Sequence, residues 1–337
     1  MMWFTRPGAR QWRCAPAPRE VRAFHAGLPG YAPTPLVELP DLAAELGVGR
    51  LLVKDESDRL GLPAFKALGA SWAVHRLLER VTAPVTLVAA TEGNHGRAVA
   101  RMARLRGRAA HVFVPEAVHP QVVRAIAGEG ARVTVVRGSY GDAVRAAAEA
   151  DGVLVQDVGW PGYEEVPTWV VEGYATLCAE VDEQLGRAPD LVVVPVGVGS
   201  LAQAVITHYR STTAAPCVLA VEPETAACVT ASLIAGEPVT IGTSDTVMAG
   251  LNCGTPSTTA WPFLRNGLDA AVTVSDAECT KAAADLHARN VHSGPCGAAP
   301  LAGLRAAPHG DLGLDSTSVV VLLGTEGTSA NPRGATG

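Results

Sequence analysis

Short runs of Val, Leu and Ala alternate with longer amphipathic stretches along most of this chain, and no other feature restricts the fold as much. Nearly continuous apolar strands between helices are typical of parallel sheets covered on both faces and joined by right-handed crossovers. The sequence therefore predicts an α/β fold with open, mostly parallel sheets flanked by helices. Strands are expected at 51–53, 85–90, 109–114, 131–136, 153–156, 191–196, 218–221 and 318–323, and helices at 65–81, 93–105, 120–127, 142–150, 166–185, 201–209, 277–289 and 298–305.

The composition is that of a folded protein with a large core. Of the 337 residues, 48% are hydrophobic and 18% charged, which allows two domains or one large one. The net charge of -6 and the absence of a basic stripe argue against a nucleic-acid partner. Residues 1 to about 32 are rich in Pro and Arg and are expected to form a loose arm.

The seven cysteines are scattered and include no Cys-x-x-Cys pair. This pattern is typical of reduced thiols in a cytosolic protein, and it indicates neither a disulfide framework nor a zinc site. We found no constellation of metal ligands, no apolar stretch of signal-peptide length and no run approaching the ~18 residues of a membrane span. We therefore expect a soluble, cytoplasmic protein without a membrane partner.

Lys66, one of only three lysines, follows a Gly/Pro loop and begins an apolar helix. Burial disfavours the charged form of an amine, so this position suits a lysine with a lowered pKa that forms a Schiff base. A solvated lysine at a helix start is the ordinary alternative. Two glycine-bracketed loops decide between these interpretations.

The first loop, residues 91–97, follows the strand predicted at 85–90, and it includes Asn94, whose amide can donate to a phenolate-like oxygen. The second, residues 196–201, has the sequence Val-Gly-Val-Gly-Ser-Leu and lies between a strand and a helix. Free backbone N–H groups at a helix N-terminus bind anions, and Ser200 adds a hydroxyl. The second loop lacks the full dinucleotide pattern and suits a single phosphate. Either loop alone is compatible with an ordinary turn. A reactive amine, a phosphate cup and an amide-bearing loop together indicate pyridoxal 5′-phosphate (PLP).

At this point the sequence resembles a known family, the fold-type II PLP enzymes of the tryptophan synthase β superfamily. Within that group it is most similar to the diaminopropionate ammonia-lyases. The matching stretches run from about residue 34 to 327; the most specific are Gly-Leu-Pro-Ala-Phe-Lys-Ala-Leu-Gly at 61–69 and Gly-Tyr-Glu-Glu-Val-Pro-Thr-Trp at 162–169.

The resemblance implies roles for individual residues. Lys66 would hold the cofactor and shuttle protons, with Phe65 beside it, and Thr325 would meet the pyridine nitrogen, although Gly324 stands where Ser is usual. Asp157 and Glu92 would remove the Cα proton from opposite faces of the substrate. Glu92 replaces the family's Asp, which implies weaker use of the D enantiomer. The other implied contacts are with the cofactor for Asn94, Gly197, Val198, Gly199, Ser200 and Leu201, and with the substrate carboxylate for Thr91, Gly93 and His95.

The resemblance also implies a large PLP-binding domain of residues 1–68 and 162–337, a small mobile domain of residues 69–161, and a homodimer. The implied activity is α,β-elimination from 2,3-diaminopropionate or a similar β-substituted alanine, giving pyruvate and ammonia. The departures at Glu92, Gly324 and Cys296 leave open an alternative reaction, serine/threonine dehydration or β-replacement in a biosynthetic pathway. A third alternative, of a different class, is a PLP-binding protein without turnover.

Overall fold

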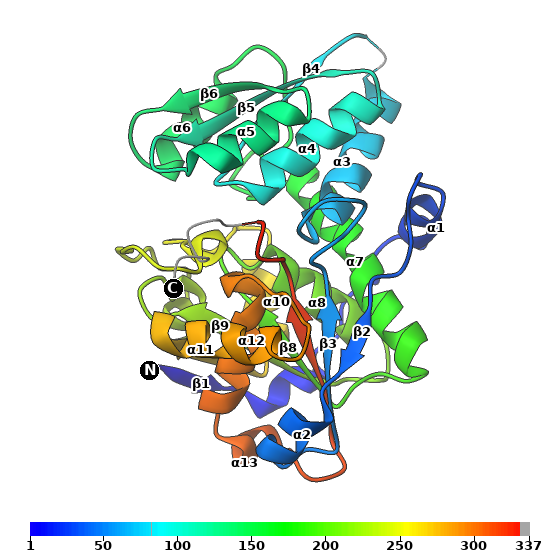
Figure 1. Ribbon diagram of the computed structural model, residues 1–337, viewed down its shortest axis with the longest axis vertical. Helices are drawn as coiled ribbons and strands as arrows, with labels where there is room; N and C mark the ends of the chain where they lie inside the picture. Colours follow the sequence, from blue (N-terminus) through cyan, green and yellow to red (C-terminus); the bar gives the residue numbers. More distant parts are fainter. Residues whose placement is uncertain (82, 331–337) are drawn as a thin grey trace.

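The computed structural model describes residues 1–81 and 83–330, and its strands form two open sheets (Figure 1). The larger sheet has seven strands in the order β1-β10-β9-β8-β11-β3-β2, and the smaller has four in the order β6-β5-β4-β7. Neighbouring strands are parallel throughout the smaller sheet and from β10 to β3 in the larger one. The predicted α/β fold class is confirmed, and the antiparallel edge strands β1 and β2 are an addition to it.

The strands are close to those expected from the sequence, with β1, β2 and β10 as unpredicted members. Their bounds are β1 Trp3–Thr5, β2 Leu36–Glu38, β3 Arg50–Asp55, β4 Thr86–Ala90, β5 Ala109–Pro115, β6 Arg132–Val136, β7 Val153–Leu154, β8 Leu191–Pro195, β9 Cys217–Pro223, β10 Ala270–Val274 and β11 Val319–Gly324.

The helices cover the faces of both sheets. Their bounds are η1 Pro7–Gln11, α1 Glu20–Ala26, α2 Pro40–Leu46, α3 Lys66–Arg80, α4 Asn94–Leu105, α5 Pro120–Gly128, α6 Tyr140–Ala148, α7 Glu165–Leu185, α8 Ser200–Arg210, α9 Cys228–Ala235, η2 Ala249–Leu251, α10 Trp261–Gly267, α11 Asp276–His287, α12 Pro295–Ala306 and α13 His309–Leu312.

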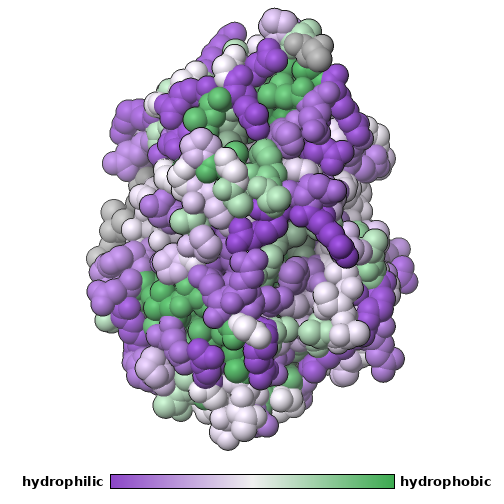
Figure 2. Space-filling view, turned by 90° about the vertical axis from the view of Figure 1, so that its right-hand side faces the viewer, coloured by the Kyte–Doolittle hydropathy of each residue, from purple (hydrophilic) through white to green (hydrophobic). Residues whose placement is uncertain are grey.

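Burial follows the strand sequences. The strands β8, β9, β10 and β11 are rich in Val, Leu and Ala and are buried along their whole length, as expected for strands covered on both faces. By contrast, β6 lies at an edge and is partly exposed. Polar side chains dominate the face of the molecule in Figure 2, between smaller hydrophobic patches.

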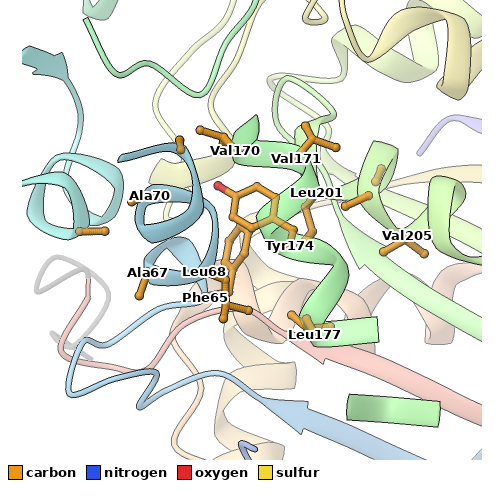
Figure 3. Packing of buried hydrophobic residues seen from close by; sticks show 14 of the residues in the cluster. Phe65, Ala67, Leu68, Ala70, Val170, Val171, Tyr174, Leu177, Leu201 and Val205 are labelled. Carbon is orange, nitrogen blue, oxygen red and sulfur yellow. The ribbon is translucent and has the colours of Figure 1, made fainter. Parts of the chain in front are cut away.

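Helices α3 and α7 lie against each other where the chain passes between the two sheets (Figures 1 and 3). Two glycines allow this close approach. A Cβ on Gly69 would lie 2.5 Å from Tyr174 Cε1, and a Cβ on Gly173 would lie 2.5 Å from the carbonyl oxygen of Leu68. Because Lys66 is the first residue of α3, this contact fixes the backbone from which the Lys66 side chain extends.

The expectation of a loose N-terminal arm is wrong. Strand β1 pairs antiparallel with β10, and the ring of Trp12 packs edge-on against Phe263 with centroids 5.7 Å apart. In α1, His25 is fully buried against α3 and α7. Pro and Arg obscure the few apolar anchors of this segment in the sequence. Among the helices within 1–81 and 83–330, none combines the length and the apolar composition that a membrane crossing requires.

Candidate active site

A cavity of about 460 Å³ lies where strand ends of both sheets meet. The larger sheet contributes the loops after β8 and β11, and the smaller sheet contributes the loops after β4 and β7. This is the edge at which open parallel sheets bind ligands. All predicted site residues line this cavity; they are Phe65, Lys66, Thr91, Glu92, Gly93, Asn94, His95, Asp157, Gly197, Val198, Gly199, Ser200, Leu201 and Thr325.

Lys66 enters the cavity from the first turn of α3. Its Nζ donates to Asp157 Oδ2 at 2.6 Å and lies 5.1 Å from the ring centroid of Phe65. Phe65 packs on Tyr174 with centroids 4.7 Å apart, and its backbone N–H donates to the carbonyl of Thr325 at 3.2 Å. The lysine is therefore held by aromatic packing on one side and by the end of β11 on the other.

The protonation state of Lys66 differs from the expectation. Burial alone would lower its pKa, but the Asp157 carboxylate, in direct contact, raises the pKa above its usual range. The pKa of Asp157 is correspondingly low: burial opposes this shift, but His95 and Lys66 outweigh it and bring the pKa to about 2. The prediction of a lowered lysine pKa is therefore wrong, because the effect of the nearby carboxylate exceeds that of burial. A charged amine becomes nucleophilic only when Asp157 or another group takes its proton.

The loop after β8 forms a backbone cradle at the N-terminus of α8. Gly199 has a φ of +99°, and a Cβ on it would lie 2.6 Å from Leu264 Cδ1, so a larger residue does not fit. A Cβ on Gly197 would lie 3.0 Å from Cys253 Sγ. Such a loop brings backbone N–H groups to the positive end of a helix, which suits a phosphate. The hydroxyl of Ser200 donates to the carbonyl of Asp157 at 2.8 Å, so here it is engaged with the loop after β7.

The loop after β4 presents Thr91, Asn94 and His95. Thr91 Oγ1 accepts from the backbone N–H of Gly93 at 2.9 Å, which closes the turn before α4. His95 Nε2 lies 2.8 Å from the carbonyl oxygen of Val155. Because a carbonyl only accepts, Nε2 carries the proton. Burial lowers the pKa of His95, so in the neutral ring the lone pair is on Nδ1.

That Nδ1 is buried, has no hydrogen-bond partner, and lies 3.8 Å from Asp157 Oδ2. The same stretch of cavity wall includes the carboxylate of Glu92, which lies close enough to Tyr140 and Cys253 to raise the pKa of both. In each of these two residues burial is the larger cause of the shift. Glu92 and Asp157 thus share one cavity with the lysine, as the two-base hypothesis requires.

The loop after β11 contributes Thr325 and Glu326, both 4% exposed. Thr325 lines the cavity, as expected. The glycine at 324 has a structural reason, because a Cβ there would lie 2.9 Å from Val53 Cγ1 on the neighbouring strand. Cys296 is buried beside this loop and packs closely against Gly250.

Some residues of this site were not predicted from the sequence. Glu326 accepts from the side chain of Asn94, and Tyr140 accepts from Gln156 Nε2 at 2.6 Å. Asn252 lines the same cavity. For Glu326 the neighbouring Thr325 was a signal. Tyr140 and Asn252 carry none, because only the packing of the two sheets brings them to the cavity.

A buried ion network holds the chain between β3 and α3. Arg59 pairs with Glu56 at 2.6 Å and with Glu180 at 2.7 Å, and Lys54 pairs with Glu180 at 2.7 Å. These four side chains are completely buried and their formal charges sum to zero. Removing one member would leave an uncompensated buried charge, so the network fixes the path of the loop that ends at Lys66.

These residues fit PLP. The cradle after β8, whose glycines leave no room for a Cβ, accommodates a phosphate, and Lys66 supplies a primary amine at the same cavity. The unpartnered Nδ1 of His95 offers an acceptor to a bound polar group. The fold and the site define the class of enzymes that bind PLP between two open α/β sheets. The family of pyridoxal-phosphate dependent enzymes matches residues 28–324, and the chain belongs to this family.

Individual relatives agree with this class. The diaminopropionate ammonia-lyase of Salmonella typhimurium is 36% identical, over 92% of this chain and 89% of its own length. A biosynthetic L-threonine dehydratase from Mycobacterium leprae is 32% identical, over 88% of this chain and 69% of its own. A crystal structure of the Escherichia coli diaminopropionate ammonia lyase, in complex with an aminoacrylate-PLP azomethine reaction intermediate, is 31% identical, with a TM-score of 0.88 over 98% of this chain and 94% of that one.

Proposed function

We propose that this chain is a PLP-dependent ammonia-lyase that performs α,β-elimination on 2,3-diaminopropionate or a similar β-substituted alanine. The net reaction consumes one water and gives pyruvate and two ammonia molecules. The observation that carries the proposal is the Lys66–Asp157 pair, 2.6 Å apart, in the same cavity as the glycine cradle. The similarity to the diaminopropionate ammonia-lyases supports this substrate class.

The cofactor, once bound, supplies a conjugated ring that stabilises negative charge at the Cα of an amino acid. In our proposal, the cradle from Gly197 to Leu201 binds its phosphate and Asn94 contacts its ring oxygen. Thr325 meets the ring nitrogen with a neutral hydroxyl, which does not keep that nitrogen protonated as a carboxylate would. A weaker electron sink favours elimination over transamination.

The remaining residues handle the substrate and its protons. The loop of Thr91, Gly93 and His95 receives the substrate carboxylate at the N-terminus of α4, where free N–H groups favour an anion. Asp157 or the amine of Lys66 takes the Cα proton, and Glu92 serves the opposite face. A general base acts within about 2.6–3.2 Å of the proton it removes, or through one water. The extra methylene of Glu92 relative to Asp therefore moves one of the two bases.

The test is pyruvate formation by the purified, PLP-loaded protein from each enantiomer of diaminopropionate. We expect pyruvate and ammonia in the ratio of one to two, with the L enantiomer preferred. Turnover of serine or an O-acylated serine with no turnover of either diaminopropionate would exclude this substrate. A new amino acid formed after addition of a thiol would instead indicate β-replacement.

We also propose that the active form is a cytoplasmic homodimer. The similarity to fold-type II enzymes and the scattered free cysteines of the described residues support this assignment. Light scattering on the purified protein tests the proposed dimer, and a monomeric mass at micromolar concentration would contradict it.

A further inference from the structure

Glu326 is an acidic side chain that reaches from the larger sheet to the first residue of α4. It follows Thr325 after β11 and is 4% exposed. Its backbone is fixed, because its carbonyl accepts from the N–H of Gly294 at 2.9 Å and it forms an antiparallel bridge with Ala64. The carboxylate therefore projects into the cavity wall from a rigid backbone.

Both carboxylate oxygens accept hydrogen bonds. Oε2 accepts from Asn94 Nδ2 at 2.8 Å, and Oε1 accepts from the backbone N–H of Cys296 at 3.2 Å. Cys296 is the second residue of α12, so this N–H has no acceptor within the helix, and the positive helix end favours a negative charge. Burial raises the pKa of Glu326, while the thiol and the backbone N–H of Cys296, together with the Asn94 amide, act in the opposite direction.

The acceptor role of Glu326 fixes the orientation of the Asn94 amide. Both oxygens of Glu326 accept from N–H donors, so Asn94 turns its NH₂ group, and not its carbonyl oxygen, toward Glu326. The NH₂ group has two hydrogens, and Glu326 engages one of them. Because Asn94 lines the same cavity as Lys66, the second hydrogen remains available to an acceptor there.

We propose that Glu326 is a positioning residue that fixes the side-chain amide of Asn94, so that its second N–H donates to the ring oxygen of the cofactor. This inference rests on the proposed contact of Asn94 with PLP. The same hydrogen bond joins α4, which follows β4 of the smaller sheet, to the end of β11 of the larger one. Glu326 thus couples the position of α4 to cofactor binding through Asn94.

The decisive variant is Glu326→Gln, which keeps the size and shape of the side chain. Its amide presents only one acceptor, so with that oxygen on the N–H of Cys296 its NH₂ group meets the NH₂ of Asn94. The two donors repel, and the Asn94 amide turns or moves away. Glu326→Asp is a second variant, which keeps the charge but shortens the reach by one methylene. Glu224→Gln, at an exposed position after β9, is the matched control.

The measurements are the dissociation constant of PLP, from titration of the apoprotein, and the position of the visible absorbance band of the loaded protein. We expect Glu326→Gln and Glu326→Asp to weaken PLP binding about tenfold, as for the loss of one hydrogen bond to a charged group, and to shift the band. Asn94→Ala should have the same effect, and Asn94→Ala combined with Glu326→Gln should bind PLP no more weakly than Asn94→Ala alone. Circular dichroism and the unfolding midpoint of each apoprotein establish that the variants are folded.

Two results would overturn the inference. One is a folded Glu326→Gln protein with the dissociation constant and band of the wild type, and the other is a double variant whose losses simply add. A wild-type protein that forms no visible band with PLP would instead contradict the proposed function.

Discussion

At the scale of single residues, the charges of the site have partners within the chain. Lys66 is neutralised by Asp157, and Glu326 is held by Asn94 and the N-terminus of α12. The lysine and the glycine cradle could be predicted from the sequence, because a loop followed by a helix start is a local pattern. Glu326 and Tyr140 could not be assigned, since their roles depend on contacts between segments far apart in the chain.

Lys66→Ala removes the amine proposed to bind the cofactor covalently. We expect the purified variant to lack the visible absorbance band and to form no pyruvate, with at least about a hundredfold loss of activity, since no other group replaces the nucleophile. Lys281→Ala, at an exposed position of α11, is the control and should keep both. A band in the Lys66→Ala protein that borohydride bleaches would place the covalent link at another amine.

Glu92→Asp restores the shorter carboxylate that resembles the family pattern. If Glu92 is the base for the D enantiomer, the variant should raise the ratio of kcat/KM for D- over L-diaminopropionate by about tenfold. The shorter side chain would bring the carboxylate back into line with the Cα proton, and a displacement of about 1 Å slows proton removal strongly. Glu149→Asp, at the exposed end of α6, should leave the ratio unchanged. Equal use of the two enantiomers by the wild type would contradict the premise.

At the scale of elements, the strands and helices with strong periodicity could be located within a few residues. The segment from 224 to 269 could not, because it has few alternating runs, and α9 and α10 are short. The prediction for the N-terminal segment was wrong for a different reason. Its three-residue strand β1 is stabilised by pairing with β10, which is 265 or more residues away in the chain and therefore leaves no local signal.

Gly173→Ala tests the contact of α7 with α3, the helix that begins at Lys66. The added Cβ would lie 2.5 Å from the carbonyl of Leu68 and 2.7 Å from Gly69 Cα, and backbone atoms cannot swing aside. We expect a loss of about 1–3 kcal/mol in the free energy of unfolding and weaker PLP binding, because the start of α3 moves. Gly128→Ala, at the end of α5 with no atom within 4 Å of the added Cβ, should be neutral or slightly stabilising. Equal unfolding midpoints for the two variants would show that α3 and α7 can move apart without loss of stability.

We expect His25 to make the junction of α1, α3 and α7 sensitive to acid. It is fully buried, with Nδ1 2.7 Å from Thr176 Oγ1 and Nε2 3.0 Å from the carbonyl oxygen of Leu68. Burial lowers its pKa from 6.5 to about 4. The folded state thus favours the neutral ring, and the stability this confers is complete above pH 6.5 and is lost as the pH falls from there to about 4.

Lowering the pH from 7.5 to 5 should reduce the unfolding free energy of the apoprotein by about 2 kcal/mol through His25 alone. Urea unfolding at the two pH values measures the loss. His25→Gln should be less stable at neutral pH but should lose about 2 kcal/mol less than the wild type over that interval. His292→Gln, at an exposed position, should keep the full loss. An identical pH dependence for His25→Gln and the wild type would exclude His25 as the titrating group.

At the scale of the whole molecule, the arrangement of two sheets around one cavity follows from strand ends that face each other. The alternating pattern predicted parallel sheets and ligand sites at their carboxyl ends, and the cavity lies there. The relative position of the sheets could not be predicted, because it depends on the contact of α3 with α7 at two glycines and on hydrogen bonds such as Asn94 to Glu326.

We expect the four-stranded sheet and its helices, within the predicted small domain of residues 69–161, to close over the cavity when substrate binds. The substrate carboxylate would dock at the N-terminus of α4, whose first residues line the cavity. The hydrogen bond from Asn94 to Glu326 joins this end of α4 to the larger sheet.

Hydrogen exchange of the PLP-loaded protein, with and without a non-reactive substrate analogue, tests this closure. The amides of 91–97 and of the loop at 157–162 should become protected, while those in the centre of β4, β5 and β6 should not change. Protection that spreads through the four-stranded sheet would mean that this sheet is itself loosely folded without ligand. Protection confined to the loop after β8 would mean that the ligand binds without domain closure.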